Sequence, residues 1–144
     1  MKRILFVVAL LSSGAVLAGH EMENRNLGNG RILYQEHCAS CHGVGLEGEP
    51  NWQQAGKDGL MPAPPHDATG HTWHHDNILL FLYTKYGGKA LMEARGMSGF
   101  KSGMPGFGDV VRDDGIWDIL AYIRSTWPEK IKTIQASRNR PHDQ

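Results

Sequence analysis

Cys38, Cys41 and His42 have the spacing Cys-x-x-Cys-His, and the two cysteines are the only ones in the chain. This spacing is the pattern of covalent haem c attachment. Two intervening residues let both thiols reach the two vinyl groups on one edge of a haem and form thioethers. The histidine that follows then presents its imidazole to the iron from the same side. The motif therefore predicts one haem c, with His42 as an axial iron ligand.

Other chemistries use two cysteines at this spacing. A thioredoxin-like redox pair requires a βαβ context, whereas here a helical pattern leads into the motif. A bare disulfide would close a very small loop. A structural zinc site needs two further ligands, which four histidines offer: His66, His71, His74 and His75. Haem attachment is the leading interpretation, with zinc and dithiol chemistry as the alternatives.

A second axial ligand to haem iron is usually methionine or histidine. Met104 is the best candidate, because Gly103 permits a close backbone approach and Pro105 stiffens the loop. Met104 also lies far enough from His42 along the chain to pass round a porphyrin. Met61 precedes a proline as well, but it follows His42 too closely to cross the haem edge and return.

The elements that must position these groups are helical. Apolar residues at helical spacing predict helices over 29–39, 77–86 and 114–126, with Asn29, Asp76 and Asp113 as their N-caps. A proline suits a first helical turn, so a short further helix is predicted over 128–137.

Glycine and proline dominate the stretches 43–70 and 96–108, which predict long loops. The expected fold class is therefore all-α, with three to four helices and no strand. Loops as long as the helices indicate a core centred on a cofactor, and wrapping one is a function that suits the loop over 43–70.

The order of these elements resembles the class I cytochrome c family in its bacterial mono-haem branch, over residues 29–127. Cys38, Cys41, His42 and the Met104-Pro105 loop carry most of the resemblance. It implies the small cytochrome c fold wrapped around one covalent haem c, with His42 and Met104 as axial ligands. Two further matches concern helix packing. Gly30 and Tyr34 match the family's helix-crossing positions, which implies Tyr122, or alternatively Trp117, as the aromatic partner.

The resemblance also implies two residues around the haem. In the family's proline turn, a proline carbonyl accepts the second ring N–H of the haem-binding histidine, a general way of orienting a metal ligand. Among the prolines of 62–65, Pro65 is chosen for this role over Pro64. Trp73 is expected to donate its indole N–H to a haem propionate, with a packed aromatic as the alternative.

Three histidines, His71, His74 and His75, have the spacing i, i+3, i+4. On a helix they would share one face and could bind a metal. They precede the predicted cap Asp76, however, so a polar turn is expected instead. Their role stays open at this point.

The N-terminus indicates export. Lys2 and Arg3 precede an apolar run, and small residues end at Ala18, which predicts a signal peptide over 1–18 and a periplasmic mature protein. Retention of this segment as an anchor is the alternative, although it is short for a bilayer span. We expect a flexible lead over 19–28, the haem domain over 29–127, and a C-terminal extension over 128–144 formed by a short helix and a frayed tail.

Charge narrows the possible partners. Removal of the leader leaves 13 basic against 15 acidic residues, which argues against nucleic acid binding. The expected function is one-electron transfer without catalysis, by a monomer that meets a redox donor and a redox acceptor transiently. A small apolar patch suited to weak encounters is expected near the haem edge, with Ala39, Val44 and Ala63 as candidates.

Three alternatives remain open from the sequence. The chain could be a haem subunit docked to a larger periplasmic oxidoreductase, with 128–144 as a docking arm. It could be a catalytic haem protein, which requires Met104 to be absent from the iron. It could also be a histidine-rich metal binder without haem.

Overall fold

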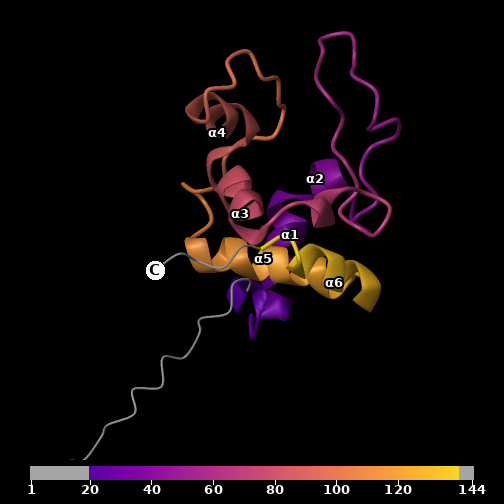
Figure 1. The fold of residues 1–144 in the computed structure, drawn as a ribbon, viewed down its shortest axis with the longest axis vertical. Coiled ribbons are helices and arrows are strands. Elements are labelled where there is room, and N and C mark those ends of the chain that lie inside the picture. The colour runs from indigo at the N-terminus through magenta and orange to yellow at the C-terminus, as the bar shows by residue number, and fades with distance from the viewer. Residues whose placement is uncertain (1–19, 140–144) are drawn as a thin grey trace, which may run out of the picture.

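The computed structural model describes residues 20–139. Within this range the chain forms helices and no strand, as expected for an all-α protein (Figure 1). Two short 3-10 helices and six α-helices follow one another along the chain: η1 (His20–Met22), α1 (Leu27–His37), α2 (Ala39–His42), η2 (Thr72–His74), α3 (Asn77–Tyr86), α4 (Gly88–Ala94), α5 (Asp113–Ser125) and α6 (Glu129–Ala136).

The crossing of α1 and α5 organises the core. Gly30 lies against α5 so closely that an added Cβ would come 2.0 Å from the Asp118 carbonyl oxygen and 3.0 Å from Tyr122 Cβ. The ring of Tyr34 is buried and contacts the ring of Tyr122, with centroids 5.7 Å apart. Tyr122 is thus the aromatic partner of this crossing, while Trp117 stacks on Phe81 instead.

The apolar stripe of α5 fills the centre of the molecule. Its members recur at helical spacing and are buried: Ile116, Ile119, Leu120 and Ile123. Trp127, just beyond the helix, is also buried. Because α5 packs on both α1 and α3, it is the element against which the other helices are oriented.

The start of α1 differs from the prediction. Asn26, rather than Asn29, is the N-cap, and its side chain accepts a hydrogen bond from the backbone N–H of Asn29. The Asn29 side chain instead donates to Asp118 of α5. The described part of the expected flexible lead is also structured, since it includes η1, and Met22 is buried against the core.

Three further boundaries need correction. Asp113 is the first residue of α5, whose N-cap is Arg112. α2 is a separate turn that carries the end of the Cys-x-x-Cys-His motif. α4 was not predicted: Gly87 ends α3 in a left-handed conformation, with φ of 81°, and α4 begins directly afterwards. The helix count is therefore higher than the three to four expected.

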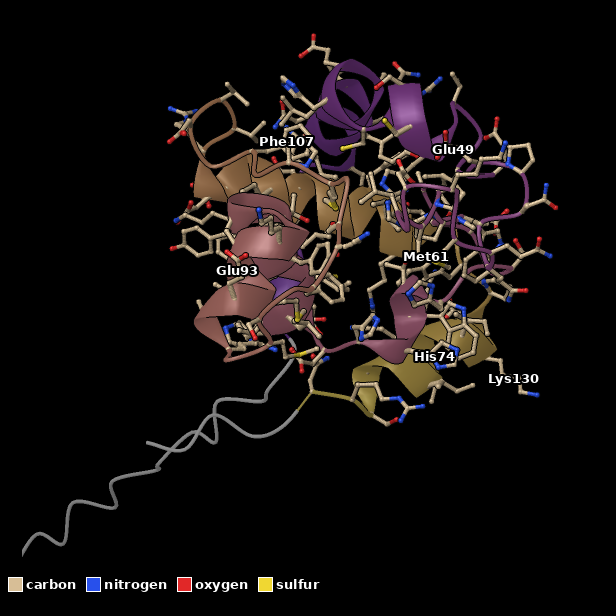
Figure 2. All side chains as sticks on the ribbon, turned by 90° about the horizontal axis from the view of Figure 1, so that it is seen from above. Glu49, Met61, His74, Glu93, Phe107 and Lys130 are labelled. Atoms are coloured by element: carbon tan, nitrogen blue, oxygen red, sulfur yellow. The ribbon has the colours of Figure 1, made fainter. Side chains whose placement is uncertain are left out.

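Two lobes rise from the same side of α5 (Figure 1). The first lobe consists of α3, α4 and the loop over 95–112, and the second consists of the loop over 43–71 that follows α2. The view from above also separates them, with Glu93 and Phe107 in the first lobe and Glu49 and Met61 in the second (Figure 2). Met104 therefore lies in the first lobe, whereas His42, the last residue of α2, directly precedes the second lobe.

The C-terminal extension is part of the domain as far as it is described. α6 packs against η2. Gln135 of α6 is buried, and its side-chain amide donates to Asn77 Oδ1 at 2.6 Å and to the His75 carbonyl at 3.3 Å. The predicted short helix is confirmed.

No helix among the described residues is both long and apolar enough to cross a bilayer. The predicted signal peptide, over 1–18, lies outside the described residues.

Candidate functional site

The Cys-x-x-Cys-His motif lies where α1 passes into α2. The Cys38 N–H donates to the Tyr34 carbonyl at 2.9 Å and closes α1, and the His42 N–H donates back to the Cys38 carbonyl at 3.0 Å. Gly43, with φ of 82°, ends α2. The Tyr34 hydroxyl donates to the Gly43 carbonyl at 2.8 Å, so the core residue of the helix crossing also fixes the end of the motif.

The two cysteines of the motif differ in burial. Cys38 is buried and Cys41 is exposed. Burial, together with the neighbouring Cys41, raises the pKa of Cys38 to about 11. A thioredoxin-like redox pair requires a βαβ context. Within residues 20–139 the motif lies instead between two helices and no strand is present, which argues against that alternative.

His42 is buried and has one ring nitrogen engaged. Its Nδ1–H donates to the Pro64 carbonyl at 2.8 Å. Burial lowers the pKa of His42, against the opposing effects of this hydrogen bond and of Glu49. A neutral imidazole with Nδ1 engaged offers Nε2 to a metal, which is the arrangement that histidine ligands commonly have.

The proline that orients His42 is Pro64, so the prediction of Pro65 for this bond is wrong. The Pro65 carbonyl turns toward Gly70, where an added Cβ would come 2.0 Å from its oxygen. Gly48 packs on the peptide between the two prolines, with an added Cβ 2.4 Å from Pro65 N. The close packing of Gly48 and Gly70 therefore fixes the conformation of this turn, in which the Pro64 carbonyl faces His42.

His66 contacts the candidate iron ligand directly, a contact that sequence reasoning missed. Its ring stacks on that of His42, with centroids 4.0 Å apart and planes 21° apart. Its Nδ1 is 2.8 Å from Thr72 Oγ1, and its carbonyl accepts from Trp127 Nε1 at 2.7 Å. Burial, then the proximity of His42, lowers the pKa of His66 well below its usual value. No local sequence signal indicates this contact.

Within the first lobe, the loop that carries Met104 is held by α3 and by the start of α4. The Met104 carbonyl accepts from Gly88 N at 3.3 Å, and its N–H donates to Ser102 Oγ at 3.2 Å. Ser102 Oγ also bonds the Tyr83 hydroxyl of α3 at 3.1 Å. An added Cβ at Gly87 would come 3.0 Å from the Met104 carbonyl oxygen. The backbone of Met104 is thus fixed by the junction of α3 and α4.

Trp73, at the centre of η2, has an indole N–H without a partner. Its Nε1 is buried and makes no hydrogen bond to any described residue. A buried donor without an acceptor is costly. An anionic group such as a haem propionate would satisfy this donor, so the environment of Trp73 fits its predicted role.

The three neighbouring histidines lie in and around η2, as the expected turn requires. The His71 ring stacks on Trp52, with centroids 5.4 Å apart, and meets the His75 ring edge-on. His74 packs on Trp73. Within residues 20–139 no three or more His, Cys, Asp or Glu side chains are grouped so that they could hold a metal ion. Neither the zinc alternative nor a histidine metal site is supported there.

Comparison with protein families identifies the fold. The family model described as cytochrome c matches residues 27–127. The chain belongs to the cytochrome c family. Comparisons with curated proteins and with solved structures give no significant match.

Membership of this family gives the cofactor and the general role. A cytochrome c binds a covalent haem c with iron, transfers electrons through it, and exchanges them with redox partners. The residues of this chain fit such a group. They provide two thiols at the attachment spacing, a neutral imidazole with one nitrogen engaged, and the Trp73 indole N–H that lacks an acceptor.

Proposed function

We propose that the mature chain is a periplasmic one-electron carrier whose single haem c is attached to Cys38 and Cys41. His42 and Met104 are the axial iron ligands. The hydrogen bond from His42 Nδ1 to the Pro64 carbonyl carries this proposal, because it leaves Nε2 for the iron directly after the second cysteine.

The haem supplies a reversible one-electron couple. The chain's own residues hold it and limit its chemistry. If His42 and Met104 both held the iron, they would leave no position for a substrate, and the protein would transfer electrons without catalysis. Ligation by a histidine and a methionine would also favour the reduced state, since it raises the potential.

The expected partners are a redox donor and a redox acceptor that bind transiently to a monomer. The exposure of Val44, at 69%, supports this. Ala39 and Ala63, the other residues expected in the apolar patch, are partly buried. A small apolar surface of this kind suits short encounters rather than a permanent complex. Export rests on the predicted signal peptide over 1–18.

Optical spectra of the exported protein test the iron ligands. The full chain is expressed in a host that matures haem c, and the periplasmic fraction is recorded oxidised and reduced. Low-spin bands on reduction and a weak red sulfur-to-iron band on oxidation are expected. That band should be lost in Met104→Ala.

Met61→Ala is the matched control, because Met61 also precedes a proline and is 49% exposed. It should retain the red band. A high-spin wild-type spectrum would remove Met104 from the iron and favour the catalytic alternative. A colourless protein in a working host would refute the assignment of the cysteines. Recovery of the haem protein in the cytoplasmic fraction would refute export, and elution with a larger complex would refute the free monomer.

A further inference from the structure

The ring of His42 needs more than one restraint to keep a fixed orientation. The hydrogen bond from Nδ1 to the Pro64 carbonyl fixes where one ring nitrogen lies. A hydrogen bond tolerates a range of distances and angles, so this one bond leaves the ring some freedom to rotate about its Cβ–Cγ bond. A group packed against the face of the imidazole resists that rotation directly.

His66 provides such a group. Its ring lies almost parallel to the His42 ring, at a centroid distance of 4.0 Å and an interplanar angle of 21°. At this distance the two rings are in face-to-face contact. Rotation of either imidazole would drive its edge into the other.

His66 is itself held at three points. Its ring nitrogen Nδ1 is 2.8 Å from Thr72 Oγ1 in η2. Its backbone N–H donates to the Leu46 carbonyl at 2.8 Å, and its carbonyl accepts from Trp127 Nε1 at 2.7 Å. One of these bonds holds the ring of His66 and the other two hold its backbone. The ring can therefore restrain the plane of the His42 imidazole better than a rotating aliphatic side chain at the same place.

We propose that His66 is a positioning residue for the haem iron, which sets the plane of the His42 imidazole by stacking on it. Thr72 anchors His66 and so acts on the same orientation from a greater distance. This inference rests on the proposed function, because it requires His42 to be an iron ligand.

The consequence is electronic as well as structural. The plane of an axial imidazole decides which iron d orbital overlaps its π system. This in turn decides how unpaired spin is distributed over the four pyrroles of an oxidised low-spin haem. Groups that orient a metal ligand tune the metal for this reason. The spread of the haem methyl resonances in the proton NMR spectrum of the oxidised protein reports that distribution.

The test compares three variants of the haem-loaded protein with the wild type. His66→Leu removes the stacked ring at similar size, and Thr72→Val removes its anchoring hydroxyl. Thr84→Val is the matched control. Thr84 is 7% exposed against 5% for Thr72, and its hydroxyl donates to the Leu80 carbonyl within its own helix.

We expect a changed order or spread of the four methyl resonances in His66→Leu, a smaller change in Thr72→Val, and the wild-type pattern in Thr84→Val. A folded His66→Leu protein with the wild-type pattern would overturn the proposal, as would a Thr84→Val change as large as that of Thr72→Val. If His66→Leu does not fold, an unchanged Thr72→Val pattern overturns it. A wild-type spectrum without low-spin haem methyl resonances would instead refute the ligation on which the proposal rests.

Discussion

Gly30 offers the sharpest test of how the fold is built. In Gly30→Ala the new Cβ would lie 2.0 Å from the Asp118 carbonyl oxygen and 2.5 Å from its carbonyl carbon. These are backbone atoms inside α5, so they cannot swing aside as a flexible side chain would. An ordinary contact needs roughly 3.4 Å or more between such atoms, so α1 and α5 would have to separate by more than an ångström.

The cost can be set against the gain that alanine brings to a helix. Overpacking a core costs about 1–3 kcal/mol and occasionally more, and a clash with backbone belongs at the upper end. Alanine improves helix propensity by up to about 1 kcal/mol over glycine. We expect Gly30→Ala to lose about 2–3 kcal/mol in the free energy of unfolding.

Gly28 provides a control within the same helix. It is exposed in α1, and an added Cβ would meet only Asn26 Oδ1, at an ordinary distance of 3.4 Å. Gly28→Ala should therefore leave stability unchanged or raise it by up to about 1 kcal/mol.

Urea unfolding of the oxidised haem protein, followed by circular dichroism, measures both variants. The two free energies of unfolding should differ by about 3 kcal/mol, which corresponds to roughly 12 °C in Tm at about 4 °C per kcal/mol for a domain of this size. Equal stability of the two alanine variants would refute the reasoning, because it would mean that the crossing of α1 and α5 does not require the absence of a side chain at Gly30.

Three other predictions concern buried polar groups. Burial raises the pKa of Tyr34 above its usual value of about 10. The stabilisation that the neutral hydroxyl contributes is therefore present below a pH of about 10 and is lost as the pH rises above it. In urea unfolding at several pH values above about 10, Tyr34→Phe should lessen the fall in the free energy of unfolding by up to about 1.4 kcal/mol per pH unit. Equal slopes of this free energy against pH in variant and wild type would contradict the prediction. Gln135→Leu, which removes the 2.6 Å bond to Asn77, should cost about 1–3 kcal/mol in urea unfolding; an unchanged midpoint would show that the bond contributes little. Trp127→Phe removes the donor to the His66 carbonyl and should cost a similar amount by the same assay; a value near zero would mean that another donor replaces it.

Sequence reasoning located the helices well where local chemistry determines them. Asp76 caps α3 as predicted, because its carboxylate accepts the Leu79 N–H. The cap of α1 was misassigned because Asn26 and Asn29 are equally good caps by type. What separates them is Asp118, far away in the sequence, which binds the Asn29 side chain. α4 is not expected from the sequence, because two glycines directly follow α3 and glycine disfavours helix, although the residues after them favour it.

The candidate site shows the same division between local and distant causes. The spacing of Cys38, Cys41 and His42 is a local pattern, and the sequence alone indicates its chemistry. Pro64 and Pro65 are adjacent, and the carbonyls of successive residues in an extended chain point to different sides. Only one of the two can therefore accept the hydrogen bond from His42. Gly48 and Gly70 settle that choice by packing on the turn. Such packing depends on the tertiary fold and leaves no mark in the local sequence.

The C-terminal helix bears on whether the protein works alone. α6 lies beyond the residues that match the family, and the sequence left open that this extension serves as a docking arm. The buried Gln135 joins α6 to Asn77 and to the His75 carbonyl. A partner that used this face of α6 would have to break those bonds and expose the amide, at a cost of about 1–3 kcal/mol for each unsatisfied group. The described part of the extension is therefore explained as a brace for η2, which carries Trp73, and the buried face of α6 is closed to a partner.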